Sequence, residues 1–190
     1  MPIFRTPKRG LSYSEAIAEA YASAPENSVI LNTLEFRHPN FIDPDTGAII
    51  AIRVVNDHVD LNATLEATAP ANAGQTVLFK AVRFSFKRPS ETDGASLPEI
   101  TITVSNVARI LIPYLDQAKE SRTPIEVTYR PYLASDLTGP HMNPPLTLTL
   151  RSVNADMNNV TAQAGFGDLV NRRFPKTDYT AKKFPGLTAR

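Results

Sequence analysis

The strongest constraint on the fold is an alternation of apolar and polar residues that occurs three times in the second half of the chain. Isoleucine and valine alternate with threonine over 100–104, and the two-residue period returns over 125–129 and 146–150. This period gives each strand one apolar face. Between the first two strands, apolar residues recur three and four positions apart over 107–118, which is the stripe of a short amphipathic helix. This part of the chain therefore predicts a strand, a helix and two further strands.

Four other runs have the composition of strands. The run 29–36 is rich in Val, Ile, Leu and Phe, and 49–55 is apolar on both faces. The run 59–65 alternates regularly, and 160–166 supplies the last strand of the pattern. Because Asn56-Asp57 has the composition of a turn, we expect 49–55 and 59–65 to form a hairpin.

The apolar phase of the run 77–86 slips by one residue near Ala81. Val77, Phe79 and Ala81 share one face of an extended chain, whereas Val82, Phe84 and Phe86 share the other. A β-bulge near Ala81 would keep both halves facing the core. A strand that is covered on both faces is the alternative.

Two helices are expected. Ser12 and Glu15 form a capping box ahead of an alanine-rich run that Pro25 ends. The second helix contains Pro113, which would remove a hydrogen bond from a helix interior. We therefore expect that helix to start near Ile112, with Pro113 in its first turn, or to break visibly.

Length and composition favour one mostly-β domain. A chain of 190 residues has the size of a single domain, and a net charge of +1 gives no electrostatic reason to expect nucleic acid or a membrane surface. The absence of Cys excludes disulfides, thiol catalysis and cysteine-bound clusters. No apolar run approaches the ~18–20 residues of a membrane span, and the N-terminus lacks a secretory apolar region.

The expected architecture is a β-sandwich or half-open barrel of about seven to nine strands with two short helices. We divide the chain into a flexible lead (1–11), a β-rich domain (12–167) and an irregular C-terminal arm (168–190). The arm is basic and aromatic, without a regular period. It therefore predicts an assembly segment that clamps a neighbouring subunit. Its candidate contacts are Arg172, Arg173, Phe174, Tyr179, Phe184 and Pro185. Nucleic acid binding by the arm is disfavoured, because its excess of cations is only local.

Residues that could carry chemistry are scattered, so we expect no catalytic, cofactor or metal site. The three histidines lie in predicted loops without metal-ligand spacing; they are His38, His58 and His141. The run Asp43-x-Asp45-x-Gly47 lacks the remaining ligands of a calcium loop, so we interpret it as a turn. Gly165-Phe166-Gly167 indicates a strand that ends against close-packed backbone. An acid pair for glycoside hydrolysis remains open, with loop candidates Asp57, Asp60, Asp136 and Asp156.

Several stretches resemble a family of small tail proteins of long-tailed bacteriophages and prophages, from about residue 12 to the C-terminus. They are Tyr21-Ala22-Ser23-Ala24-Pro25, Thr33-Leu34-Glu35-Phe36-Arg37-His38-Pro39, Ile52-Arg53-Val54-Val55-Asn56-Asp57, Val127-Thr128-Tyr129 with Tyr132-Leu133-Ala134-Ser135-Asp136, and Ala164-Gly165-Phe166-Gly167-Asp168-Leu169-Val170-Asn171-Arg172-Arg173-Phe174-Pro175. The run 102–107 with the helix and strand after it is more distantly similar to the N-terminal region of the lambda-type minor tail protein L family. That family ends in a Cys-rich segment associated with an iron–sulfur cluster, which this Cys-free chain cannot carry.

The resemblance implies a non-enzymatic structural component of the virion tail tip, made in the host cytoplasm and present as a three- or six-copy ring. It implies partners among copies of the chain and other tail proteins, namely the tail tube, the hub and the central fibre. Hub and distal-tail positions are both compatible with it. The alternatives are a tail-associated cell-wall hydrolase and a module that binds a host receptor or carbohydrate.

Overall fold

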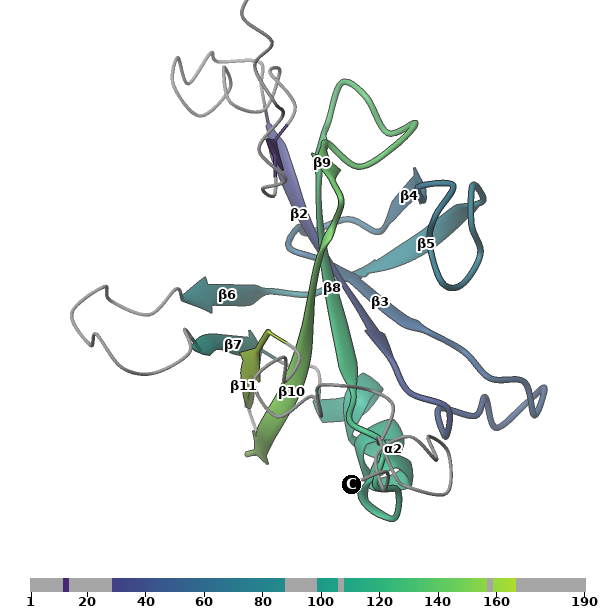
Figure 1. Ribbon diagram of the computed structural model, residues 1–190, viewed down its shortest axis with the longest axis vertical. Helices are drawn as coiled ribbons and strands as arrows, with labels where there is room; N and C mark the ends of the chain where they lie inside the picture. Colours follow the sequence, from purple (N-terminus) through teal and green to yellow (C-terminus); the bar gives the residue numbers. More distant parts are fainter. Residues whose placement is uncertain (1–11, 14–28, 88–98, 106–107, 157–158, 167–190) are drawn as a thin grey trace, which may run out of the picture.

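The computed structural model describes residues 12–13, 29–87, 99–105, 108–156 and 159–166. Most of them form one open sheet of nine strands, ordered β4-β5-β3-β2-β8-β10-β11-β7-β6 (Figure 1). A separate two-stranded sheet pairs β1 with β9. The expected mostly-β fold is therefore confirmed. No helix in these ranges is long and apolar enough to cross a membrane.

The strands of the main sheet follow the predicted alternation closely. They are β2 (Ile30–Arg37), β3 (Ile52–Val55), β4 (Leu61–Thr64), β5 (Thr76–Ala81), β6 (Phe84–Lys87), β7 (Glu99–Ser105), β8 (Glu126–Leu133), β10 (Leu146–Ala155) and β11 (Asn159–Gly165). The small sheet consists of β1 (Ser12–Tyr13) and β9 (Met142–Asn143), which are too short for a pattern to predict. The expected helix after Ser12 falls at 14–28 and lies outside the described residues.

The predicted hairpin of 49–55 with 59–65 is wrong. β5 lies between β3 and β4, antiparallel to β4 and parallel to β3. The carboxylate of Asp60, just before β4, holds β4 on this different neighbour. It accepts hydrogen bonds from the backbone N–H of Ala81 (2.8 Å) and from Lys80 Nζ (2.9 Å), both on β5. Sequence alternation gives the faces of a strand but not its neighbour.

The phase slip near Ala81 marks a change of pairing partner. β5 ends at Ala81, and the next residue donates its backbone N–H to the carbonyl of Val55 on β3 (2.9 Å). One residue later, the carbonyl of Arg83 accepts a hydrogen bond from Ser105 on β7 (2.8 Å). The chain thus leaves one end of the sheet and becomes the opposite edge strand, so β5 and β6 lie on opposite sides of the molecule in Figure 1. The position of the slip was predictable, but its cause is this change of partner instead of a bulge.

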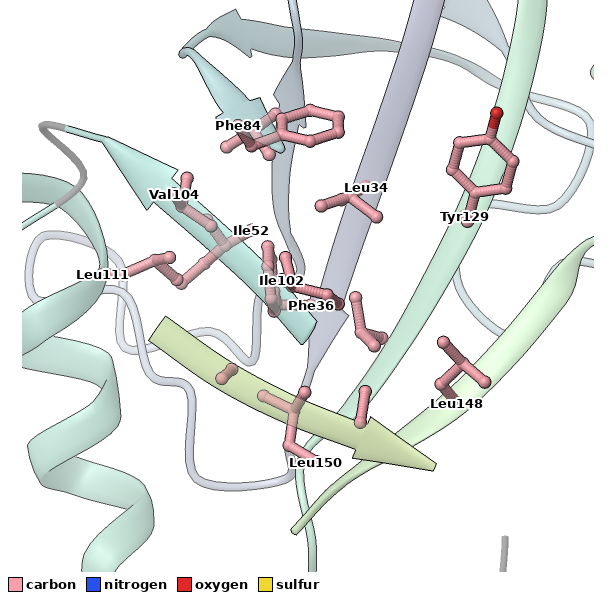
Figure 2. Close-up of a cluster of buried hydrophobic side chains, with 14 of the residues drawn as sticks. Leu34, Phe36, Ile52, Phe84, Ile102, Val104, Leu111, Tyr129, Leu148 and Leu150 are labelled. Carbon is pink, nitrogen blue, oxygen red and sulfur yellow. The ribbon is translucent and has the colours of Figure 1, made fainter. Parts of the chain in front are cut away.

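This path of the chain produces two hydrophobic clusters. The main cluster joins β2, β3, β8 and β10 with β6, β7, β11 and α2, and Figure 2 shows Leu34, Ile102 and Leu148 within it. The smaller cluster lies around Phe79 and Tyr132, whose ring centroids are 6.0 Å apart. Burial raises the pKa of Tyr132, so its hydroxyl stays protonated and donates to the Thr64 carbonyl (2.9 Å).

The second predicted helix is present as α2 (Ala108–Lys119). Pro113 lies inside it, so the expectation of a late start or a visible break is wrong. Pro113 is exposed, so water can reach the turn that lacks its hydrogen bond, while Leu111 and Ala118 are buried in the main cluster. Burial of these side chains offsets the cost of the missing bond.

Candidate functional site

A cluster of charged side chains is buried on the face of the sheet opposite the main core. Glu35 of β2 lies at its centre, and its Oε2 accepts a hydrogen bond from Arg53 Nε at 2.7 Å. Its Oε1 lies 3.4 Å from Arg130 Nη1 and 3.5 Å from Arg37 Nε. The side chains of Glu35 and Arg130 have no exposed surface. Alternation places all four residues on one face of β2, β3 and β8, because odd and even positions of a strand point to opposite sides.

The segment that follows β4 is tied to the same cluster. Arg130 Nε and Nη2 donate to the two carboxylate oxygens of Glu66 at 2.7 and 2.8 Å, a bidentate pair. Burial alone would raise the pKa of Glu66, but the hydrogen bonds and charge of Arg130 outweigh it and hold that pKa below its usual value. Arg53 Nη2 donates to Asn72 Oδ1 at 2.8 Å, which fixes a second point of this segment.

Arg37 carries the cluster toward solvent. Its Nη2 donates to Glu126 Oε2 at 3.0 Å and to Thr128 Oγ1 at 3.2 Å. We call the whole set the buried ion network; its members are Glu35, Arg37, Arg53, Glu66, Glu126 and Arg130. Three guanidinium groups face three carboxylates, so the charges balance. These pairs join β2, β3 and β8 to one another and to the segment after β4. The network is therefore a structural connection between three strands and the segment after β4.

The unfolding free energy is expected to fall as the pH drops below the ordinary Glu pKa of about 4.3. Because the pKa of Glu66 is lower in the folded chain than in the unfolded one, its contribution is fully present above the unfolded value and is lost as the pH falls through the folded value. Glu66→Gln should therefore flatten the acid dependence of urea unfolding, measured from about pH 7 to about pH 3. An acid slope identical to that of the native chain would contradict this assignment.

The three histidines occupy separate places. His38 is buried; its Nε2 lies 3.0 Å from the Thr123 carbonyl, and its Nδ1 accepts a hydrogen bond from the backbone of Asn40 at 3.0 Å. His58 is exposed in the loop between β3 and β4, and His141 Nε2 lies 3.6 Å from Asp136. His38 thus positions a loop. Within the described ranges, no group of three or more His, Cys, Asp or Glu residues could hold a metal ion.

Three of the four loop acids accept hydrogen bonds through their carboxylates, and the fourth, Asp156, forms one through its backbone. Asp57 accepts a hydrogen bond from the backbone of His58. Asp60 binds β5 as described above, and these hydrogen bonds lower its pKa. Hydrogen bonds from the side chain and backbone of Thr138 lower the pKa of Asp136. The backbone N–H of Asp156 donates to the Asn159 carbonyl at 2.8 Å, which closes the connection to β11. The structure describes no direct contact that pairs two of these carboxylates for hydrolysis.

The two glycine motifs have structural roles. Asp43 Oδ1 accepts a hydrogen bond from the backbone of Asp45, and Gly47, with a φ of 67°, donates to the Asp43 carbonyl. The predicted turn is confirmed. At Gly165, a Cβ would lie 2.9 Å from Arg151 Nε, so this glycine packs against an arginine side chain and not against the backbone that the sequence predicted.

A groove with a mixed apolar and polar lining lies between α2 and the outer half of β10. Its volume is about 400 Å³. The apolar lining residues are Ile112, Leu115, Ala118, Ile125, Leu150, Val153 and Ala155. β10 pairs with β8 only over 146–149, whereas its outer half pairs with β11 through Ala155. Among the described residues, no strand pairs with the β8-facing edge of β10 beyond Leu150. We call this edge the β10 margin.

A hairpin between β2 and β3 projects beside α2 (Figure 1). Gln117 of α2 holds it: Gln117 Oε1 accepts the backbone N–H of Ile42 at 3.0 Å. Phe41 anchors it from inside, with its ring centroid 5.8 Å from that of Tyr114. Ile42 and Ile49 face each other across the hairpin and are 44% and 69% exposed. An exposed pair of isoleucines on a held loop is suited to protein contact.

The six assembly residues proposed for the arm lie outside the described residues. The chain reaches that arm through Phe166, which is partly buried against the main cluster. Gly165, just before it, is opposite Thr149, where β10 leaves β8. The last described residues before the arm therefore lie close to the start of the β10 margin.

Comparison with protein families gives one match. Residues 16–179 match a family described as a domain of unknown function, DUF1833. The chain belongs to this family. The matched range includes all nine strands of the main sheet, the buried ion network and the groove beside α2. No curated protein matches the chain.

Proposed function

We propose that the chain is a structural component of a bacteriophage tail tip, in the hub or the distal tail ring. In this role it assembles with copies of itself in a three- or six-copy ring and with other tail proteins, and it carries out no catalysis. The observation that carries the proposal is the β10 margin beside the groove, part of whose lining is apolar. The resemblance to phage tail proteins gives the biological setting, the virion tail.

The margin and the groove provide the two parts of a strand-mediated contact. The backbone N–H and C=O groups of an open margin pair readily with a strand of another chain. The groove beside it, lined by Ile112, Leu115 and Val153, accepts apolar side chains from that strand. A contact between two different surfaces of identical subunits closes into a ring when the rotation between them allows.

The C-terminal arm supplies the chemistry that such a groove binds. Phe174, Tyr179 and Phe184 are aromatic, and Pro185 restricts the backbone next to the last of them. Arg172 and Arg173 can form bidentate pairs with carboxylates on a neighbour. We propose that the arm of one copy contacts the margin and groove of the next. The arm of 23 residues spans up to about 80 Å when it is extended, which is enough to reach an adjacent subunit.

A chain truncated after Phe166 is expected to fold but not to assemble. All described strands precede the cut, and Phe166 stays in place against the core. Sedimentation velocity measures self-assembly of the purified proteins. Complementation of a phage that lacks the chain measures tail assembly. Thermal unfolding of the truncated chain is the folding control.

A full-length variant with Phe174, Tyr179 and Phe184 replaced by alanine tests whether the aromatic side chains of the arm are needed in addition to its length. It should fail in assembly as the truncated chain does. Normal tail assembly by the truncated chain would contradict the role of the arm. Clearing of purified peptidoglycan by the isolated protein would favour the hydrolase instead.

A further inference from the structure

A second concave surface lies far from the arm in sequence, where the loop after β3 meets β6 and β7. We propose that this surface binds a neutral, polyhydroxylated glycan chain. The proposal goes beyond tail assembly, and none of the residues that line the cavity is assigned to assembly. The cavity has a volume of about 370 Å³. Its lining residues are Asn56, Asp57, His58, Arg83, Phe84, Ser85, Thr103 and Ser105.

The folding of the chain explains why these polar groups meet. Phe84 turns its ring into the main core, so Ser85 points to the outer face of β6. Ser85 pairs with Thr103 on β7, and Ser105 is the next residue along that face. The change of pairing partner after β5 places Arg83 at the rim, and the loop 56–60 brings Asp57 from the other side.

The cavity adjoins a face on which most of the described side chains are polar and uncharged. The residues of β6, β7, β11 and the outer half of β10 that point away from the core include Ser85, Thr101, Thr103, Ser105, Thr161, Gln163, Ser152 and Asn154. Register confirms their common side: Ser152 is opposite Gln163, and Asn154 is opposite Thr161. Arg151, over Gly165, marks the border of this face. Hydroxyl and amide groups both donate and accept hydrogen bonds, as the hydroxyl groups of a sugar do.

The charged groups in the cavity favour a neutral ligand over an anion. Asp57 uses Oδ1 for the backbone of His58, which leaves Oδ2 without a hydrogen bond among the described residues. That carboxylate would repel phosphate or sulfate but accept a sugar hydroxyl. Arg83 is exposed and forms no ion pair with a described residue, so its guanidinium can donate to ring or hydroxyl oxygens. Together the two side chains complement a ligand whose groups donate and accept at neighbouring positions.

A glycan microarray tests the proposal with the full-length protein. The array carries neutral bacterial oligosaccharides together with phosphorylated and sulfated ones. We expect binding to neutral oligosaccharides. The affinity should change little when the salt concentration is raised, because a neutral ligand forms no ion pair with the protein that salt could screen. Arg83→Ala and Thr103→Val should each weaken this binding about tenfold, since each removes hydrogen bonds to the ligand. Thr103→Val keeps the shape of the side chain and its preference for strands.

Arg122→Ala is the matched control, because Arg122 is also an exposed arginine without an ion pair to a described residue. It should bind the array as the native chain does. Thermal unfolding checks that all three variants are folded. The proposal is overturned by the absence of binding to every neutral oligosaccharide, by binding restricted to charged glycans, or by an equal loss in Arg122→Ala. Failure of tail assembly would leave this result unaffected.

Discussion

Replacement of Arg130 by methionine is expected to destabilise the protein by about 3–5 kcal/mol, the cost of removing one partner from a buried ion pair. Arg130 is fully buried and contacts both Glu35 and Glu66. Methionine fills part of the volume but leaves the fully buried Glu35 carboxylate with less positive charge around it. An unpaired buried charge costs more than the pair contributes, so the loss should far exceed that of a surface ion pair.

Urea unfolding of Arg130→Met measures this loss, and Lys80→Met is the control. Lys80 pairs with Asp60 at 2.9 Å, but its side chain is 54% exposed, so solvent screens the pair. The control should therefore change the unfolding free energy only slightly. A double-mutant cycle between Arg130 and Glu66 isolates their direct interaction. Equal losses in Arg130→Met and Lys80→Met would show that the buried ion network contributes no more than a surface pair.

Phe79→Ala is expected to destabilise the protein by about 3–5 kcal/mol, the range for truncation of a buried phenylalanine. Phe79 has no exposed surface and packs against Tyr132 in the smaller cluster. That cluster contains few large side chains, so its neighbours cannot collapse far into the space left behind. Loss of this ring should also loosen the pairing of β4 with β5.

The neighbouring residue provides the control for this change. Leu78 is on the same strand but points outward and is 44% exposed. Leu78→Ala should cost much less than Phe79→Ala, because little apolar surface is returned to water. Chemical denaturation of both variants makes the comparison. Similar losses would mean that the smaller cluster does not contribute as a packed core.

The strands and α2 could be predicted because burial on one face spaces the apolar residues regularly along the sequence. Ile100, Ile102 and Val104 all point into the main cluster, as their alternation with threonine predicted. Which strands pair with one another leaves no such regular spacing in the sequence. The expected hairpin of 49–55 with 59–65 was therefore wrong, although both strands were recognised. The expected late start or break of the helix at Pro113 was wrong for a related reason. Tertiary packing of α2 outweighs the low helix propensity of proline.

The buried ion network was not predicted. Glu35 and Arg130 are charged residues that are fully buried on the face of the sheet opposite the main core. Each alone has the pattern of a solvated face, and only the pairing of β2 with β8 brings them together. The uncharged polar face beside the cavity was also missed. Its threonines were recognised as the side of their strands that faces away from the core. The loop after β3 is far away in sequence, so its proximity to them could not be predicted.

The central claim is that the chain is built into the tail tip as a ring. Immunogold electron microscopy of purified particles with an epitope-tagged chain tests it most directly. The proposal predicts label confined to the distal end of the tail, with three or six copies per particle by quantitative mass spectrometry. Particles that carry no label, or label distributed along the tail or over the head, would contradict it.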